Sequence, residues 1–138
     1  MKFKNLIIVL LIVFVSSILG IYFFKDKFRN EDDLVKNVNP ADITYLTPSE
    51  IEANLDSHDP DYYNNNIIQV IGEVKSISVD SNSAVLKSEN NDIEVIFQKG
   101  EDLSKIKDGS FISVRGVAKP PLSKSFILRI TSSIITVK

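Results

Sequence analysis

The sequence predicts a mainly β chain, with a five-stranded barrel, one helix ahead of the barrel and an apolar helix at the N-terminus. Three observations lead to this prediction. Residues 5–24 contain no charged side chain. From residue 67 onward, short stretches of alternating apolar and polar residues are separated by turn residues, which is typical of a β-sandwich or barrel. Between these regions, the stretch Thr47-Pro48-Ser49-Glu50 has the composition of a helix start.

The uncharged stretch predicts a transmembrane anchor at residues 6–24, preceded by a short basic N-terminus at residues 1–5. A helix of this length spans about 30 Å, the thickness of a hydrocarbon core. The alternative is a signal peptide cleaved near Val15-Ser16-Ser17, but the apolar run continues beyond that point. Basic residues flank both ends, so the positive-inside rule hardly decides the orientation. Because a short basic region before an apolar run is the usual export signal, we expect a single-pass membrane protein with an extracytoplasmic domain.

Charge divides the remainder of the chain into two parts. Residues 30–61 hold nine acidic residues against one basic residue, Lys36, whereas residues 62–138 are close to neutral. The acidic part begins with a polar stretch in which apolar residues recur at neither the helical nor the strand period. We therefore expect a polar acidic linker over residues 25–44, in which residues 30–42 are a solvated spacer, and a folded domain over residues 45–138.

A short helix is expected directly ahead of the barrel. Thr47 can cap its start, and Glu50 follows three residues later, where it completes a capping box. Ile51 and Leu55 are four residues apart and share a helix face that can pack on the barrel. We expect the helix to end near Asp56.

Residues 56–61 contain three aspartates and the only histidine of the chain, His58. Hard cations such as Ca²⁺ prefer oxygen ligands, so a metal site is one interpretation of this cluster. The spacing, the central glycine and the distal glutamate of an EF-hand loop are all absent. Asp, Ser and Pro are also standard turn residues, and a turn is the interpretation that we favour. We expect neither a metal nor a cofactor.

Five strands are expected in the barrel. They start at Ile67 and then cover residues 84–88, 93–97, 111–118 and 126–137, the last one bent near residues 131–133. Residues 101–107 predict a short helix or turn with Leu103 and Ile106 directed to the core. Three strands, this segment and two further strands are the order of an OB-fold, a five-stranded Greek-key barrel. The alternative is an SH3-type barrel, which gives no reason for the segment between the third and fourth strands.

These motifs resemble the tRNA-anticodon-like OB-fold family, which places small OB domains on bacterial membrane or lipoprotein anchors. The resemblance covers residues 47–137 and depends on the capped helix, the pair Tyr62-Tyr63, the stretch IIQVIGEVKSI and the strands IEVIF and DGSFISVRGVA. It implies a fold and no established substrate. Members often carry cysteines in the third and fifth strands, where this chain has Ile96 and Ser132-Ser133, so those cysteines have no role here.

The residue types argue against an enzyme. There is no cysteine, which excludes disulfides, cysteine-bound zinc, thiol nucleophiles and the acylated cysteine of a lipoprotein anchor. The chain has one histidine and none of the G-x-S-x-G, P-loop or dinucleotide-binding motifs. We therefore predict a non-catalytic domain.

The outward positions of the barrel supply a candidate ligand face. Its six residues are Lys75, Lys87, Ile96, Phe111, Arg115 and Arg129. Exposed Ile96, Phe111 and Val117 can form an apolar partner patch. By analogy with other OB domains, the contact loops are residues 78–83 and 119–125.

Two kinds of partner fit such a face. OB barrels bind single-stranded nucleic acid through basic grooves and stacked aromatic residues. Here Glu89, Asp92 and Glu94 share the face, and the isoelectric point of about 5.4 is acidic, which weighs against phosphate binding. We therefore expect a membrane-anchored binding or scaffolding module of the cell envelope with a protein or glycan partner. Single-stranded nucleic-acid binding is the alternative.

Overall fold

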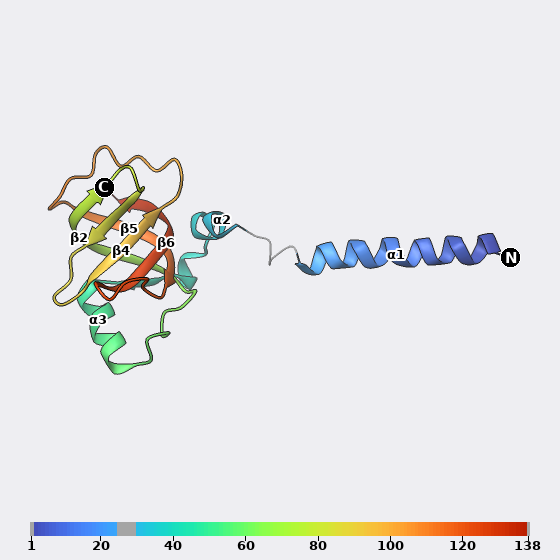
Figure 1. Cartoon of the computed structure of the whole chain (residues 1–138), viewed down its shortest axis with the longest axis horizontal. Helices are drawn as coiled ribbons and strands as arrows, with labels where there is room; N and C mark the ends of the chain where they lie inside the picture. The colour runs from blue at the N-terminus through green and yellow to red at the C-terminus, as the bar shows by residue number, and fades with distance from the viewer. Residues whose placement is uncertain (1, 25–29, 138) are drawn as a thin grey trace. The chain divides into compact units, whose positions relative to one another are not determined.

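The computed structural model describes residues 2–24 and 30–137, and it divides into two compact units, residues 1–30 and 31–138. The first unit consists of helix α1 (Lys2–Phe24) (Figure 1). Its stretch Lys2–Tyr22 has a mean hydropathy of 2.6, and none of it is buried within the protein. By length and composition, α1 is therefore able to cross a membrane.

The second unit is a closed barrel of five strands. These are β2 (Ile67–Ser78), β3 (Ser83–Leu86), β4 (Asp92–Phe97), β5 (Phe111–Lys119) and β6 (Phe126–Val137). Neighbours follow the order β2-β3-β4-β6-β5, and β5 pairs back onto β2 to close the sheet. All of these pairs are antiparallel except β4 with β6. The predicted mainly β class and five-stranded barrel are confirmed, and the strand order is that of an OB-fold.

Four short elements precede the barrel within the same unit. They are α2 (Glu31–Lys36), the 3₁₀ helix η1 (Pro40–Asp42), β1 (Thr44–Leu46) and α3 (Pro48–Ser57). Strand β1 adds to the barrel by pairing in parallel with β2. The predicted capping box at the start of α3 is present: the Thr47 hydroxyl accepts from the Glu50 backbone N–H, and the Glu50 carboxylate accepts from the Thr47 N–H.

The segment that we expected to be a solvated spacer packs against the barrel. Helix α2 contacts β5 and β6, and the Val35 side chain is fully buried. The Gln98 side-chain amide donates to the Asp32 carbonyl at 2.9 Å, and the Lys119 ammonium lies 2.9 Å from the Glu31 carboxylate. The compact unit therefore begins at Glu31. A single buried valine creates no apolar periodicity, so this contact cannot be predicted from the local sequence.

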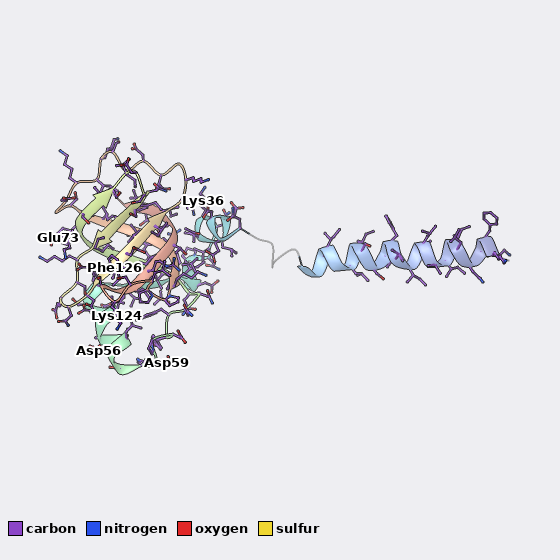
Figure 2. The ribbon with its side chains drawn as sticks, viewed as in Figure 1. Lys36, Asp56, Asp59, Glu73, Lys124 and Phe126 are labelled. Carbon is purple, nitrogen blue, oxygen red and sulfur yellow. The ribbon has the colours of Figure 1, made fainter. Side chains whose placement is uncertain are left out.

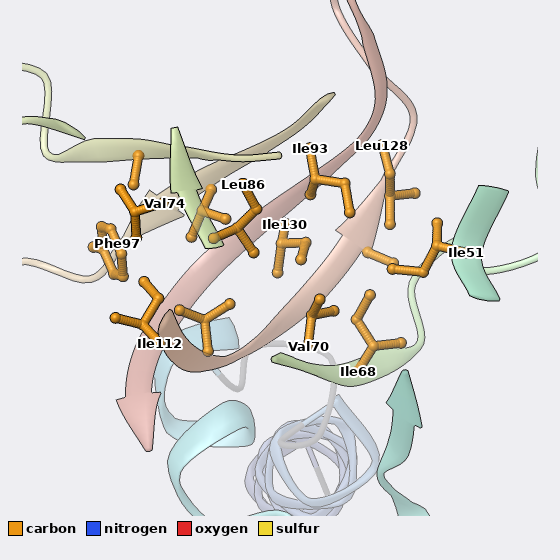
Figure 3. Packing of buried hydrophobic residues seen from close by; sticks show 14 of the residues in the cluster. Ile51, Ile68, Val70, Val74, Leu86, Ile93, Phe97, Ile112, Leu128 and Ile130 are labelled. Carbon is orange, nitrogen blue, oxygen red and sulfur yellow. The ribbon is translucent and has the colours of Figure 1, made fainter. Parts of the chain in front are cut away.

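The core of the barrel is built from the inward positions of the alternating strands (Figure 3). Fully buried side chains come from all five strands: Ile68, Val70, Leu86, Ile93, Val95, Val114 and Ile130. Ile51 of α3 is fully buried in the same cluster, with Leu55 partly buried against it, so the predicted helix face packs as expected.

The segment between β4 and β5 forms turns rather than the short helix that was one of the two predictions. Leu103 and Ile106 still reach the core, at 5% and 6% exposure. The Asp102 carboxylate accepts from both the backbone N–H and the hydroxyl of Ser104, at 3.0 and 2.6 Å. Such local bonds compete with helix formation, which explains why turns are formed here.

The predicted bend of the last strand is also present. Ser132 has φ of +53°, and the pairing of β6 with β4 shifts register next to it. Opposite this bend, a Cβ on Gly116 would lie 2.5 Å from Ile130 Cγ2 and 2.6 Å from the Thr131 carbonyl oxygen. No side chain fits at that distance, so glycine is required at this point in the antiparallel pairing of β5 with β6.

Candidate binding groove

An open groove of about 370 Å³ lies on the outer surface where α3 begins beside the barrel. Its lining comes from four separate segments: Thr47, Pro48, Ser49, Ile71, Gly72, Glu73, Lys87, Ser88, Glu89 and Phe111. We call this feature the α3 groove. More of its exposed lining is apolar than polar, which is the usual character of a ligand site.

The pairing of β2 with β5 produces the apolar part of the α3 groove. Phe111 lies opposite Glu73 in the register, and Ile71 precedes Glu73 by two residues on the same outer face. The side chains of Ile71 and Phe111 remain 57% and 68% exposed. Figure 2 shows Glu73 at the surface of the barrel. Two large apolar side chains thus stand exposed on neighbouring strands beside the groove.

Gly72 allows the start of α3 to approach β2 closely. A Cβ added to Gly72 would lie 3.1 Å from Pro48 Cγ and 3.6 Å from Leu86 Cδ1. The distance to Pro48 is tighter than most Cβ contacts, so a side chain at position 72 would require Pro48 to shift by a few tenths of an ångström. A glycine inside a strand often marks a close approach of another segment, and here that segment is the start of α3 at the groove.

A second, more polar hollow of about 460 Å³ adjoins the α3 groove. The two share Glu73, Lys87, Ser88 and Glu89, and the second extends to the residues Val74, Lys75, Asn90, Asp92 and Gly109. Within it, the Lys75 ammonium lies 2.7 Å from the Asp92 carboxylate. This ion pair compensates both charges.

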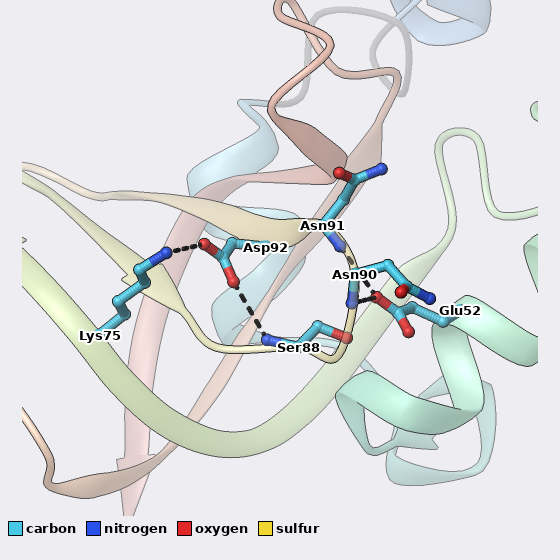
Figure 4. Close-up of polar contacts among 6 residues, drawn as sticks. All are labelled: Glu52, Lys75, Ser88, Asn90, Asn91 and Asp92. Atoms are coloured by element: carbon cyan, nitrogen blue, oxygen red, sulfur yellow. Dashed lines mark hydrogen bonds and ion pairs between the residues drawn. The ribbon is translucent and has the colours of Figure 1, made fainter.

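Glu52 of α3 fixes the turn between β3 and β4 that borders both hollows (Figure 4). Its carboxylate accepts from the backbone N–H groups of Asn90 and Asn91, at 3.0 and 3.2 Å, and the residue is only 6% exposed. Burial raises the pKa of Glu52, but hydrogen bonds that include these two outweigh burial and hold the pKa below its usual value. The carboxylate is therefore ionised and ties α3 to the turn.

The structure brings together three of the six residues predicted for the ligand face. Lys87 and Phe111 line the α3 groove, while Lys75 and Lys87 line the polar hollow. Arg115 lies elsewhere on β5, where its guanidinium donates to the Gln69 side-chain oxygen at 3.1 and 3.2 Å. Ile96 and Arg129 are half-buried on β4 and β6.

The predicted apolar patch of Ile96, Phe111 and Val117 is wrong, because Val117 is only 5% exposed. Val117 lies on β5, which α2 contacts, and no local pattern in the sequence indicates this contact. Sequence reasoning also missed Ile71. An apolar residue between Gln69 and Glu73, at an outward position of the alternation, was the signal that could have found it.

The outer face of β3 and β4 is the surface with which OB domains commonly bind single strands. Its outward side chains are Ser83, Val85, Asp92, Glu94 and Ile96, all half-buried. Phe97 points inward and is 4% exposed. These two strands, which the structure describes completely, therefore present no aromatic side chain on which bases could stack.

Residues 56–61 end α3 and begin a turn, as predicted. His58 is the C-cap of α3, and its ring stacks on Tyr62 with 4.2 Å between ring centroids. The neighbouring Tyr63 is buried in the core and its hydroxyl accepts from the Asn54 side chain at 2.5 Å. Within residues 2–24 and 30–137, no group of three or more acidic, histidine or cysteine side chains is placed to hold a metal ion.

Neither a protein-family description nor a curated protein sequence matches the chain. Solved structures do match. One is described as a "putative nucleic acid-binding lipoprotein" from Klebsiella pneumoniae subsp. pneumoniae MGH 78578, with a TM-score of 0.55 and 10% sequence identity. The match covers 78% of this chain and 99% of that one. At this identity the likeness concerns the fold, and it fits a small OB-like barrel without establishing the tRNA-anticodon-like family. Together with the apolar helix α1, a lipoprotein neighbour is consistent with membrane or envelope association.

Proposed function

We propose that this protein is a membrane-anchored, non-catalytic module of the cell envelope that binds a protein partner in the α3 groove. The observation that carries the proposal is the pair of exposed apolar side chains, Ile71 and Phe111, beside a largely apolar groove. Single exposed apolar residues are normal, but two large ones beside one groove are typical of an interaction site. The apolar helix α1 supports the anchor.

The location of the domain can be tested by cysteine labelling, because the chain contains no cysteine of its own. Lys124→Cys places a thiol in the exposed loop between β5 and β6, and Lys4→Cys places one ahead of the apolar run. We expect a membrane-impermeant maleimide to label position 124, and not position 4, in intact cells stripped of any outer barrier. Labelling of position 124 only after lysis would contradict an extracytoplasmic domain.

Partner binding can be tested by photocrosslinking in the same cells. A photoreactive amino acid at position 111 should crosslink to a discrete envelope protein, and Ile71→Ser should remove that product. The matched control is position 122, because Leu122 is 79% exposed but lies outside the groove. Equal products from positions 111 and 122, or none from position 111, would contradict the proposed function.

Single-stranded nucleic-acid binding is the second candidate function, and the description of the Klebsiella structure favours it. Phosphate contacts make such binding strongly dependent on salt. An oligonucleotide titration at two salt concentrations therefore separates the candidates. Salt-sensitive binding that is abolished by Lys87→Glu with Arg115→Glu would support nucleic acid. Against that function stand the absence of aromatic side chains on the outer face of β3 and β4 and the acidic residues Glu89 and Glu94.

A further inference from the structure

We propose that the α3 groove accepts an extended segment of a partner protein that carries a large apolar side chain next to a lysine or arginine. This inference rests on the proposed function and specifies the chemistry of its partner. It follows from the shape and the apolar residues of the groove, and from the charges along its rim.

The size of the groove suits a side chain rather than a long polymer. Its volume of about 370 Å³ is near the lower end of ligand sites, which measure about 300–1,000 Å³. Ile71 and Phe111 contribute exposed apolar surface from two strands, and Pro48 contributes from the start of α3. An apolar side chain that enters here removes all three surfaces from water, which favours binding by about 25 cal/mol for each Å² buried.

The charges around the groove favour a cation. Glu73 and Glu89 line it, and Glu50 in the first turn of α3 follows the lining residue Ser49. Lys87 is the only basic residue among the lining residues. The ion pair in the adjoining hollow is neutral and does not change this balance. A lysine or arginine beside the bound apolar side chain would therefore be attracted to the rim, and a phosphate would be repelled.

The rim also argues against nucleic acid as the occupant of this groove. Single strands bind where a basic groove follows the phosphates and aromatic rings stack on successive bases. The α3 groove has an acidic rim, and Phe111 is its one aromatic lining residue. A peptide with a basic and an apolar side chain fits both the acidic rim and the apolar lining better than a single-stranded nucleic acid does.

The test uses Phe111→Trp as a reporter in the full chain, held in detergent micelles. The chain contains no tryptophan, so this residue supplies the only indole signal and keeps an aromatic ring beside the groove. The probes are the acetylated peptide amides Ser-Gly-Lys-Leu-Lys-Gly-Ser and Ser-Gly-Glu-Leu-Glu-Gly-Ser, and a third in which serine replaces the leucine of the lysine peptide. We expect saturable changes in emission with the lysine peptide, and a Kd about fivefold to tenfold lower than for the other two.

Two sets of variants locate the binding. On the reporter background, Glu73→Lys with Glu89→Lys should reverse the preference, so that the glutamate peptide binds more tightly. The matched control, Asp61→Lys with Asp80→Lys, makes the same change of charge outside the groove and should leave the preference unchanged. Ile71→Ser should raise the Kd about fivefold or more, whereas Val79→Ser should not, although Val79 is 68% exposed.

Several outcomes would overturn the inference. They are equal affinity for the lysine and glutamate peptides, no binding of either peptide, binding that the groove variants do not change, and tighter, salt-sensitive binding of oligo(dT) at the reporter. Photocrosslinking from position 111 to an envelope protein is an independent result. If photocrosslinking succeeds while the peptide test fails, the proposed function is retained, and the inference that the partner segment is apolar and basic is refuted.

Discussion

Replacing Glu52 with alanine should remove the hydrogen bonds that connect α3 to the turn that borders the groove. The buried carboxylate accepts from the backbone N–H groups of Asn90 and Asn91 (Figure 4). Alanine leaves both donors without this acceptor and separates the turn from the helix. We therefore expect a lower free energy of unfolding. We also expect Ser88 and Glu89, which line the groove next to this turn, to be less firmly positioned.

The magnitude follows from the two hydrogen bonds. A hydrogen bond to a charged group contributes about 1.5–3 kcal/mol, so two contribute about 3–6 kcal/mol. Removing Glu52 also recovers the cost of burying its charge, and water can reach the exposed residues Asn90 and Asn91. We expect a net loss of about 2 kcal/mol. With a urea m-value of about 2 kcal/mol/M, the midpoint should fall by about 1 M.

The same carboxylate predicts a dependence on pH. The pKa of Glu52 is lower in the folded state than its usual value of 4.5, so the ionised form is stabilised by folding. Its contribution is present above pH 4.5 and is lost as the pH falls through the lowered pKa. Glu52→Gln cannot ionise, so the difference in stability between the wild type and this variant should be largest near neutral pH and shrink in acid.

The assay is urea unfolding of the full chain in detergent micelles, followed by tyrosine fluorescence because Tyr63 is buried in the core. Measurements at pH 7 and at lower pH values down to about 3 cover the titration. The control is Glu89→Gln, which removes an exposed charge next to the same turn. A midpoint for Glu52→Ala within about 0.2 M of the wild type would refute the reasoning, as would equal pH dependence of the wild type and Glu52→Gln.

Three further substitutions test the fold. Thr47→Ala removes the cap of α3 and should cost about 1 kcal/mol in the same urea assay, and a value near zero would show that the bond to Glu50 contributes nothing. Gly116→Ala forces a Cβ into contact with Ile130 and should cost about 2 kcal/mol or more, so an unchanged midpoint would contradict the close approach of β6 to Gly116 of β5. Val35→Ser should release α2 and raise amide hydrogen exchange there while the barrel stays protected, and unchanged exchange would show that α2 does not depend on this contact.

The features that the sequence determined by itself are local ones. An uncharged run of twenty residues is enough to predict α1, because an apolar stretch of this length is typical of a membrane-spanning helix. The start of α3 needs only Thr47 and Glu50, which bond to each other across one turn. The inward faces of the strands follow from alternation, since successive side chains point to opposite sides of a strand. The order of these local elements along the chain predicts the strand order of an OB-fold, and the pairing confirms it.

Segments with weak local preferences were harder to predict. The two apolar residues Leu103 and Ile106 are three apart, a spacing that fits a helical turn and a tight turn equally. The side chain of Asp102 decided between them by bonding to Ser104. Residues 31–44 gave no periodic signal, because α2 is held by one buried valine and by contacts to Gln98 and Lys119, which are distant in sequence.

Only the tertiary structure decided where a partner could bind. Ile71 and Phe111 are far apart in the sequence, and the register of β2 with β5 makes them neighbours. In the folded barrel Val117 is only 5% exposed and Arg115 donates to Gln69 of β2, although the alternation alone placed both residues outside. Local sequence fixes which way a side chain points on its own strand. Which other side chains it meets depends on contacts between distant segments, and these form only when the barrel closes.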